Sequence, residues 1–319
     1  MKSHNTKRLI LFLKGIPFSF LSLILPRKKR IIFNSTHNEN FTFNSKFLFL
    51  YFLENEKQVP FYFVINDQKK RESLTSQYGD YFIEANSFSG ILFILQSKVW
   101  ITSSLETPIG GFCHSFRREV IHLGHGTPIK NIGLLEKNIS LLKKIYYRIV
   151  KTNFTYLISS SKVFVPIWAS FLNFSQDKVF VLGQPRCDYI KEQTKENEKR
   201  KILYAPTWRP YEYNVLEPFD DFDLKKLETF LDNSDTELYL RLHPLNEKRV
   251  NSFKFNKNIK LLDSSDCPDI IDQLDEFDIL ITDYSSIFFD YLYLNRPIIF
   301  LRDDINPVSY THLTLPTKA

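Results

Sequence analysis

Three kinds of pattern are missing from this 319-residue sequence, and each absence excludes a class of protein. Cysteine occurs only as Cys113, Cys187 and Cys267, far apart and without CxxC spacing, so neither a disulfide framework nor a structural zinc site is indicated. No helix-turn-helix, zinc-finger or aromatic RNA-binding motif appears, which argues against nucleic acid as a partner. No acidic cluster has metal-binding spacing, so we expect no essential metal and no cofactor. A reducing cytoplasm is the compartment that fits these features best.

The first 30 residues also lack an uninterrupted apolar run. Residues 9–26 are largely apolar, but Lys14 and Pro17 interrupt them, and a spanning helix needs about 20 predominantly apolar residues. The basic cluster 27–30 follows directly, without a small-residue cleavage site, which argues against a secretory signal. We predict that residues 1–30 lie on the membrane surface as an interfacial anchor, with the basic side chains on anionic headgroups. The alternative is an ordinary first helix packed on the body of the protein.

The composition provides apolar material for more than one domain. Hydrophobic residues make up 43% of the chain, with 30 Phe and 16 Tyr, and 319 residues exceed the usual size of a single domain. The net charge of +6 and the pI of about 8.9 suit a partner that carries phosphates, or an anionic membrane surface. Together with the anchor, this predicts a peripheral protein on the cytoplasmic face of the cell membrane.

From Arg30 onward, short apolar segments alternate with helical stretches such as 44–53 and 161–171. This alternation is typical of an α/β protein with parallel sheets covered on both faces. We predict two Rossmann-type domains, 31–185 and 186–307, that face a cleft and bind ligands at the carboxyl ends of their strands. The predicted strands are 31–33, 61–65, 81–83, 99–102, 120–123, 156–159 and 179–182 in the first domain, and 201–205, 237–242, 259–262, 279–282 and 297–301 in the second.

The segment 279–291 carries the first candidate site. An apolar strand is followed by the turn Thr282-Asp283-Tyr284, and from Ser285 onward apolar residues recur at helical spacing, so Ser285 and Ser286 begin a helix. A helix N-terminus after a parallel strand offers free N–H groups and a positive dipole end to a phosphate. The alternative is that the serines merely cap the helix.

A second candidate is His125, which lies between Gly124 and Gly126 directly after a predicted strand. Glycines allow a tight turn, and histidine is the side chain best able to take a proton from a hydroxyl near neutral pH. A lone histidine can equally be structural. Lys130, five residues on, could serve a phosphate or simply solvent.

Two further strand ends carry phosphate-binding side chains. Thr207 and Arg209 follow one strand, and the guanidinium of Arg209 offers a planar fork of donors to phosphate oxygens. Arg241 and His243 lie on the same side of the next predicted strand, at a spacing of two. The alternative for the first segment is a structural proline turn with a tryptophan in the core.

Five motifs, in this order and spacing, resemble the CDP-glycerol glycerophosphotransferase family of teichoic-acid and capsule polymer synthesis. The resemblance covers about residues 30 to 303. The motifs are Gly124-His125-Gly126-Thr127-Pro128 with Lys130 and Gly133, Gly183-Gln184-Pro185-Arg186-Cys187-Asp188, Tyr204-Ala205-Pro206-Thr207-Trp208-Arg209, Arg241-Leu242-His243-Pro244, and Thr282-Asp283-Tyr284-Ser285-Ser286 with Asn295-Arg296-Pro297.

The resemblance implies a GT-B-like fold, with an N-terminal acceptor domain and a C-terminal domain that holds the CDP-activated donor. It also implies that a hydroxyl of a lipid-linked glycan or growing polymer attacks the phosphorus next to glycerol in CDP-glycerol, with CMP leaving; CDP-ribitol is the nearest alternative donor. His125 is similar in position to the general base, with Gly126, Thr127 and Lys130 on the acceptor side. The donor phosphates would be held by Arg241, His243, Thr207, Arg209, Ser285 and Ser286, with His243 offsetting charge on the leaving CMP and Asp283 fixing its turn.

The end of the chain departs from the family pattern. Residues 308–319 resemble the translation of a sequencing adapter, and we exclude them, so the donor domain is expected to be incomplete and the activity of the chain impaired. Two other function classes stay open: a nucleotide-sugar glycosyltransferase on the same fold, and a non-catalytic protein that binds polyanions or membranes.

Overall fold

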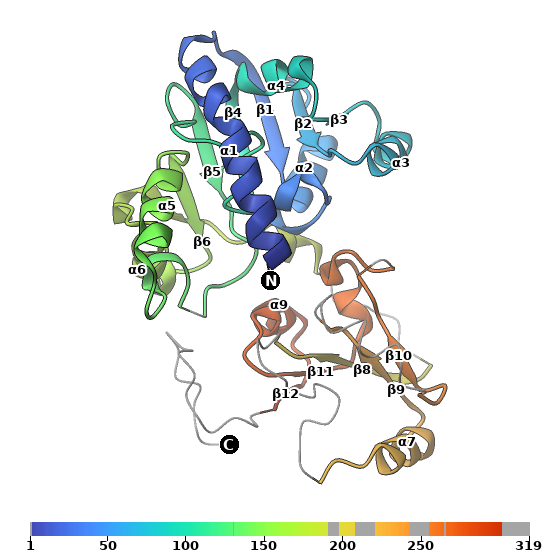
Figure 1. Ribbon diagram of the computed structural model, residues 1–319. Helices are drawn as coiled ribbons and strands as arrows, with labels where there is room; N and C mark the ends of the chain where they lie inside the picture. The colour runs from blue at the N-terminus through green and yellow to red at the C-terminus, as the bar shows by residue number, and fades with distance from the viewer. Residues whose placement is uncertain are drawn as a thin grey trace. The chain divides into compact units, whose positions relative to one another are not determined.

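The computed structural model describes residues 2–129, 131–190, 198–207, 221–242, 255–264 and 266–301. The chain divides into two compact units, Met1–Arg186 and Cys187–Ala319, and each contains one parallel sheet (Figure 1). The predicted α/β class with parallel sheets is therefore confirmed. The cleft between two domains stays a prediction.

The sheet of the first unit has seven strands in the order β3-β2-β1-β4-β5-β6-β7, and all neighbouring pairs are parallel. The strand order reverses between β1 and β4, and ligands of such sheets bind near this reversal, at the carboxyl ends of the strands. The strands are β1 (Lys28–Asn34), β2 (Phe61–Val64), β3 (Phe82–Ile83), β4 (Ser97–Thr102), β5 (Glu119–His122), β6 (Tyr156–Ser159) and β7 (Val179–Val181), and the helices are α1 (Lys2–Ile24), α2 (Phe43–Asn55), α3 (Gln68–Tyr78), α4 (Phe88–Leu95), α5 (Leu141–Lys151) and α6 (Val165–Leu172).

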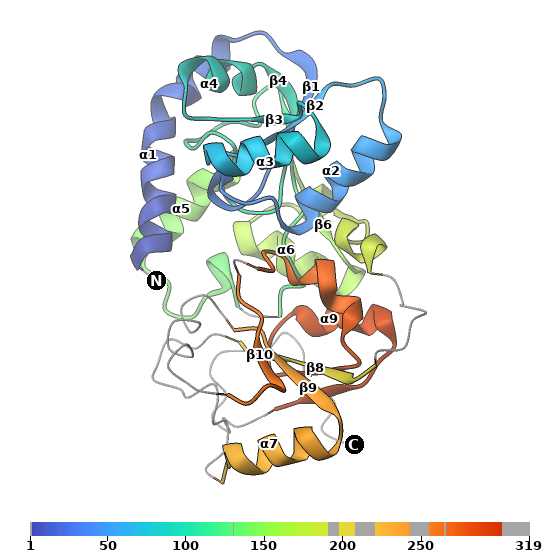
Figure 2. The ribbon, with the colours of Figure 1, turned by 90° about the vertical axis from the view of Figure 1, so that its right-hand side faces the viewer.

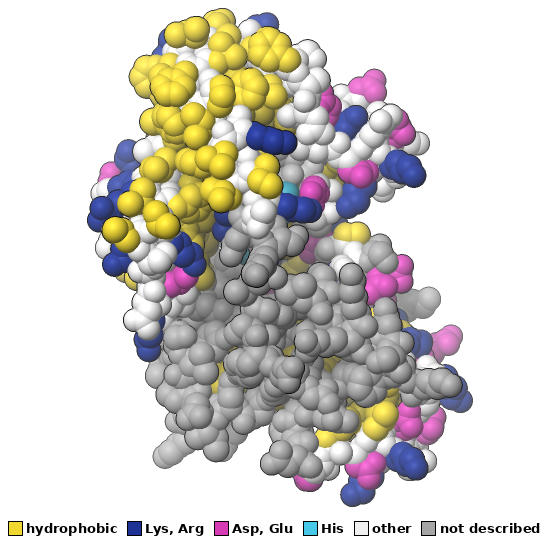
Figure 3. Space-filling view, in the orientation of Figure 1, with side chains coloured by type: hydrophobic (Ala, Val, Ile, Leu, Met, Phe, Trp, Pro, Cys, Tyr) yellow, Lys and Arg dark blue, Asp and Glu magenta, His cyan; other side chains and the backbone are white. Residues whose placement is uncertain are grey.

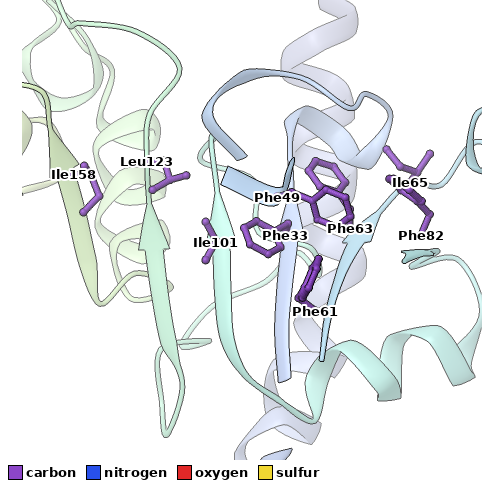
Figure 4. Packing of buried hydrophobic residues seen from close by; sticks show 9 residues of the cluster. All are labelled: Phe33, Phe49, Phe61, Phe63, Ile65, Phe82, Ile101, Leu123 and Ile158. Atoms are coloured by element: carbon purple, nitrogen blue, oxygen red, sulfur yellow. The ribbon is translucent and has the colours of Figure 1, made fainter. Parts of the chain in front are cut away.

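Helices cover both faces of this sheet (Figure 2). Side chains alternate along each strand, so residues two apart share a face of the sheet. On one face they form an apolar cluster that packs on α2 and α3, and its buried members are drawn in Figure 4. Phe33, Phe49 and Phe63 form edge-to-face or stacked ring pairs in this cluster, with centroids 5.6–6.5 Å apart, which adds about 0.5–1.5 kcal/mol per pair to the effect of burial. The opposite face carries Tyr62, whose ring packs on Phe93 of α4.

Helix α1 packs on that opposite face through its small residues. A methyl group added at Gly15 would lie 1.8 Å from the carbonyl carbon of Gly110, so the backbones of helix and loop touch. Further along, the Ser19 hydroxyl accepts a hydrogen bond from the N–H of Phe112 at 2.9 Å. The helix runs through Pro17 without a break. The predicted alternative of a first helix packed on the body is thus part of the structure.

The outward side of α1 is apolar, the reverse of an ordinary surface helix. In the described part of the chain, no helix has the length and apolar character needed to cross a membrane. Six of the large apolar side chains of α1 are exposed: Leu9, Ile10, Leu13, Phe20, Leu23 and Ile24. The interfacial anchor therefore remains a prediction, and it concerns this outward side.

The second unit has five parallel strands in the order β10-β9-β8-β11-β12. Its strand order reverses between β8 and β11. The apolar cluster of β8, β9 and α7 includes Tyr204, Leu231 and Leu240. The strands are β8 (Arg200–Ala205), β9 (Thr236–Leu240), β10 (Ile259–Leu261), β11 (Ile279–Thr282) and β12 (Ile298–Phe300), and the helices are α7 (Leu224–Asn233) and α9 (Ile287–Tyr291).

Most predicted boundaries differ from the structure by one to three residues, and two of them show what ends or delays an element. The helix expected over 161–171 begins as a 3-10 turn, Lys162–Phe164, and becomes α-helical only at Val165, because Pro166 occupies the first turn of α6 and has no N–H to donate. The strand expected over 237–242 ends at Leu240, although the N–H of Arg241 still donates to the carbonyl of Tyr204 at 2.9 Å.

Candidate active site

The turn after β5 presents His125 at the carboxyl end of the first sheet. Strand β5 ends at His122, and the turn depends on Gly124 and Gly126, whose φ angles are +69° and +158°. A methyl group at Gly124 would also lie 2.9 Å from the ring of Trp168, so backbone angle and space both favour glycine. His125 itself is exposed. The predicted tight turn is confirmed.

The hydrogen bonding of His125 suits a proton acceptor. Its Nδ1 lies 3.1 Å from the carbonyl oxygen of Ser103, so Nδ1 carries the proton and donates, and Nε2 keeps its lone pair. Although the residue is open to solvent, enough protein lies around it to lower its pKa below the ordinary 6.5 by hindering hydration. Arg186 lowers this pKa further, while the Ser103 hydrogen bond and Glu106 oppose the shift. The imidazole is therefore neutral at pH 7, as a general base must be.

The segment 183–186 supports this turn, a role that its motif did not reveal. The guanidinium of Arg186 donates to the carbonyl of His125 at 2.8 Å. The side-chain amide of Gln184 donates to the hydroxyl of Thr127 at 3.3 Å. Thr127 is buried, so its hydroxyl serves the turn, and its predicted contact with the acceptor stays a prediction, as does that of Gly126. Lys130 lies outside the described residues.

In the second unit, Thr207 and Asp283 meet where the strand order reverses. They follow the neighbouring strands β8 and β11, and the Asp283 carboxylate accepts a hydrogen bond from the N–H of Thr207 at 2.8 Å. The hydroxyl of Thr282 donates to the carbonyl of Ala205 at 2.7 Å beside them. Both Thr207 and Asp283 are buried, so the carboxylate fixes two loops to each other.

Ser285 and Ser286 lie in the same turn, just before α9. Ser286 occupies the N-cap position, but its side chain makes no capping hydrogen bond. Both serines are half-buried. The alternative that Ser286 serves as a side-chain cap is therefore wrong, and the predicted binding of phosphate by the pair stays a prediction.

Arg241 follows β9, the strand beside β8. One N–H of its guanidinium donates to the carbonyl of Leu262 at 3.2 Å, and the other donors of the guanidinium can still face an anion. The structure thus brings Arg241, Thr207 and Asp283 to the same end of one sheet. Arg209 and His243 lie outside the described residues. Within the part of the chain that the structure describes, no group of three or more His, Cys, Asp or Glu side chains could hold a metal ion.

Each unit thus contributes chemistry suited to phosphoryl transfer. The first offers a neutral imidazole in a fixed tautomer, and the second offers a guanidinium and hydroxyl groups at strand ends. Such transfer depends on positioning the nucleophile and on stabilising charge on phosphate oxygens.

Comparison with known proteins gives the family. The chain matches the family model of CDP-glycerol:poly(glycerophosphate) glycerophosphotransferase over residues 17–315. It is 29% identical to the teichoic acid glycerol-phosphate transferase of Staphylococcus aureus, over 96% of this chain and 82% of that protein. It is 31% identical to the teichoic acid ribitol-phosphate primase of Bacillus spizizenii, over 49% of this chain and 43% of that protein.

A solved structure shares the fold. The wall teichoic acid polymerase TagF, in a crystal soaked with CDPG, has a TM-score of 0.71 and 21% identity over 93% of this chain and 74% of that one. The family model spans more than half of the chain, including the turn of His125 and the Thr207–Asp283 contact. The chain belongs to the CDP-glycerol:poly(glycerophosphate) glycerophosphotransferase family.

Proposed function

We propose that this protein transfers glycerol phosphate from CDP-glycerol to a hydroxyl of a lipid-linked glycan or a growing teichoic-acid or capsule polymer. The reaction releases CMP. The observation that carries this proposal is the state of His125. Its imidazole is neutral and exposed in a turn, and its Nδ1–H donates a hydrogen bond to the carbonyl oxygen of Ser103.

The acceptor hydroxyl gives its proton to Nε2 of His125 as its oxygen attacks the phosphorus next to glycerol. The new bond joins that oxygen to phosphorus, and the bond from this phosphorus to the bridging pyrophosphate oxygen breaks. The electron pair leaves with CMP. Loss of the proton makes the oxygen a stronger nucleophile, which is the usual contribution of a general base.

The donor phosphates are held at the end of the second sheet. Arg241 contributes positive charge, and Ser285 and Ser286 contribute hydroxyl donors. Asp283 acts indirectly, because its carboxylate holds the N–H of Thr207. Arg209 and His243 are assigned to the same phosphates by their motifs.

Release of CMP tests this reaction. The chain is incubated with membrane acceptor and CDP-glycerol or CDP-ribitol, in wild type and in His125→Ala, and a UDP-sugar is tested as a competitor of the CDP donor. We expect release with CDP-glycerol, and a loss of about 10²- to 10⁴-fold in the variant. Release with CDP-ribitol alone would replace CDP-glycerol by CDP-ribitol as the proposed donor, in line with the similarity to a ribitol-phosphate primase. Release unaffected by His125→Ala would reject the base.

We also propose that the protein docks on the cytoplasmic face of the membrane, where a lipid-linked acceptor is presented. Figure 3 shows apolar side chains gathered over α1 and α5, with Lys and Arg beside them. The ring of Phe12 on α1 packs edge-on against Tyr146 on α5, so the two helices adjoin. We call this surface the apolar patch; its exposed members are Leu9, Ile10, Leu13, Phe20, Leu23, Ile24, Leu141, Leu142 and Ile145.

Basic residues accompany the apolar side chains on α5. Lys143, Lys144 and Arg148 are exposed on the same helix as Leu141 and Leu142. Apolar side chains that enter the interface, next to cations that meet anionic headgroups, are the two elements of interfacial binding. The patch extends the predicted anchor from residues 1–30 to a second helix.

A charge placed in the apolar patch tests the docking. Phe20 is 60% exposed, and Phe20→Glu should lower affinity for anionic phospholipid vesicles by about tenfold or more, since burying such a side chain stabilises binding by about 1.5–3 kcal/mol. Tyr51→Glu is the matched control, because Tyr51 is 54% exposed on α2, on the other side of the sheet. Equal vesicle binding by both variants would reject the patch. A point change is preferable to deleting α1, which would also remove its packing on the body.

A further inference from the structure

The first turn of α2 lies against the turn that carries His125. Asn44 is fully buried there. Its side-chain N–H groups donate to the carbonyl of Gly124 at 3.0 Å and to the side-chain oxygen of Gln184 at 3.2 Å. Its side-chain oxygen accepts from the N–H of Arg186 at 3.4 Å. A single amide therefore joins the two segments that flank the base.

The next residue of α2 fixes the hydrogen-bond acceptor of the imidazole. The N–H of Ser45 donates to the hydroxyl of Ser103 at 2.7 Å. The carbonyl of the same Ser103 accepts from Nδ1 of His125. This contact connects α2 to the residue whose carbonyl oxygen determines which ring nitrogen of His125 carries the proton.

Phe43, the first residue of α2, has an unusual backbone. Its φ is +64°, in the left-handed region that bulky side chains rarely adopt. Its ring packs on the imidazole of His125, with centroids 5.4 Å apart and planes inclined by 43°. Strained backbone of this kind persists where neighbouring contacts hold it, and the bonds of Asn44 and Ser45 supply such contacts.

We propose that this turn, Phe43-Asn44-Ser45, is a positioning element for the general base. Asn44 holds the backbone of the His125 turn and Ser45 holds the Ser103 loop. The ring of Phe43 holds the plane of the imidazole and shields the side that it contacts from water. The inference rests on the proposed function, in which His125 takes the proton.

The charges that shift the pKa of His125 most come from elements other than α2. The buried Lys46 of α2 has its ammonium 4.8 Å from the ring centroid of Phe47. Arg186 from the segment after β7 and Arg8 from α1 lower its pKa, while Glu106 from the loop after β4 raises it. His122, at the end of β5, is itself buried and neutral, with its pKa lowered to about 3. The contribution of Phe43 is therefore exclusion of water, and a smaller side chain in its place should move the pKa of His125 up, toward its ordinary value.

Two variants separate positioning from folding. Asn44→Ala removes the amide that joins the two segments, and we expect kcat to fall about 10- to 100-fold with KM within twofold. Phe43→Leu keeps every Asn44 bond and an apolar side chain at the same backbone angle, but removes the ring. We expect it to shift the acid limb of the kcat profile to higher pH, and Phe43→Tyr to restore the wild-type profile. Asn55→Ala and Tyr51→Leu, both exposed positions on α2, are the matched controls.

An NMR titration of the His125 imidazole gives a readout that needs no donor or acceptor. If wild type releases no CMP but Phe43→Leu still raises the pKa of His125, the proposed function fails and the positioning role stands. If wild type is active, and both variants lower only the melting temperature while kcat, pH profile and titration match the controls, the inference is overturned. Should Asn44→Ala not fold, Phe43→Leu decides the outcome by itself.

Discussion

The buried ion pair between α1 and the loop after β4 allows a quantitative prediction. Nε of Arg8 lies 2.5 Å from Oε1 of Glu106, whose side chain is only 2% exposed. Arg8→Ala leaves this carboxylate in the interior without its cation. Removal of one partner of a buried pair costs about 3–5 kcal/mol, and because the Arg8 side chain is 24% exposed, water can reach part of the gap. We therefore expect a loss of about 3 kcal/mol in the free energy of unfolding.

The preceding residue supplies the matched control. Lys7 pairs with Glu39 at 2.9 Å, but the two side chains are 51% and 44% exposed, so Lys7→Ala should cost less than about 1 kcal/mol. Urea unfolding at pH 7, followed by tryptophan fluorescence, measures both losses, because Trp100 and Trp168 are buried in the same unit as α1. The difference between the two variants is the quantity of interest.

The pH dependence of the loss identifies the carboxylate. Burial alone would raise the pKa of Glu106, but Arg8 and hydrogen bonds outweigh it and hold this pKa below the ordinary 4.5. In wild type, the stability from this group is present above pH 4.5 and is lost as the pH falls through the folded-state pKa. In Arg8→Ala, burial prevails and the pKa of Glu106 rises. Protonation then removes the unpaired buried charge, so the deficit of the variant in the free energy of unfolding, relative to wild type, shrinks from pH 7 toward pH 5. A deficit equal to that of Lys7→Ala, or one unchanged over this range, would refute the reasoning.

Three other outcomes are expected. Gly124→Ala should destabilise the fold by about 1–2 kcal/mol and lower CMP release, because of the positive φ and the nearby ring of Trp168; full activity would contradict the geometry of the turn. Asp283→Ala should cost about 1–3 kcal/mol in urea unfolding, since the N–H of Thr207 loses its buried acceptor, and a smaller loss would show that the loops are held by other contacts. The acid limb of CMP release should have its midpoint below pH 6.5, because the lowered pKa keeps His125 neutral; a midpoint above 6.5 would contradict the hindered hydration of the imidazole.

The strands could be predicted because each is a short apolar run. The segments 31–33, 156–159 and 279–282 lie within or match β1, β6 and β11, since burial on both faces leaves continuous apolar residues in the sequence. The end of β9 was harder to place. The N–H of Arg241 still donates to the neighbouring strand, although β9 has ended at Leu240. The apolar pattern of the sequence does not indicate where regular strand pairing stops.

The candidate site was predicted only where a local motif exposes it. His125 between two glycines is a signal within three residues. Asn44 gave no such signal, because its partner Gln184 lies 140 residues away and only the topology of the sheet brings them together. The positive φ of Phe43 was equally hidden, since a phenylalanine there contradicts the local preference of its own type. The role of a buried amide at the start of a helix depends on contacts with distant segments, so it can be recognised only once the fold is known.

The contact of Gly15 with Gly110 restricts how the N-terminal helix can be exchanged. Its outward side should accept almost any large apolar residue, whereas its inward side has no room for even one methyl group at Gly15. An unrelated amphipathic helix grafted onto residue 25 would supply a new apolar side for the proposed lipid contact, but it would stand away from the loop of Gly110, without Arg8 beside Glu106. In this protein the segment proposed to meet the bilayer is also part of the first unit's architecture, so changes that tune such binding are confined to one side of the helix.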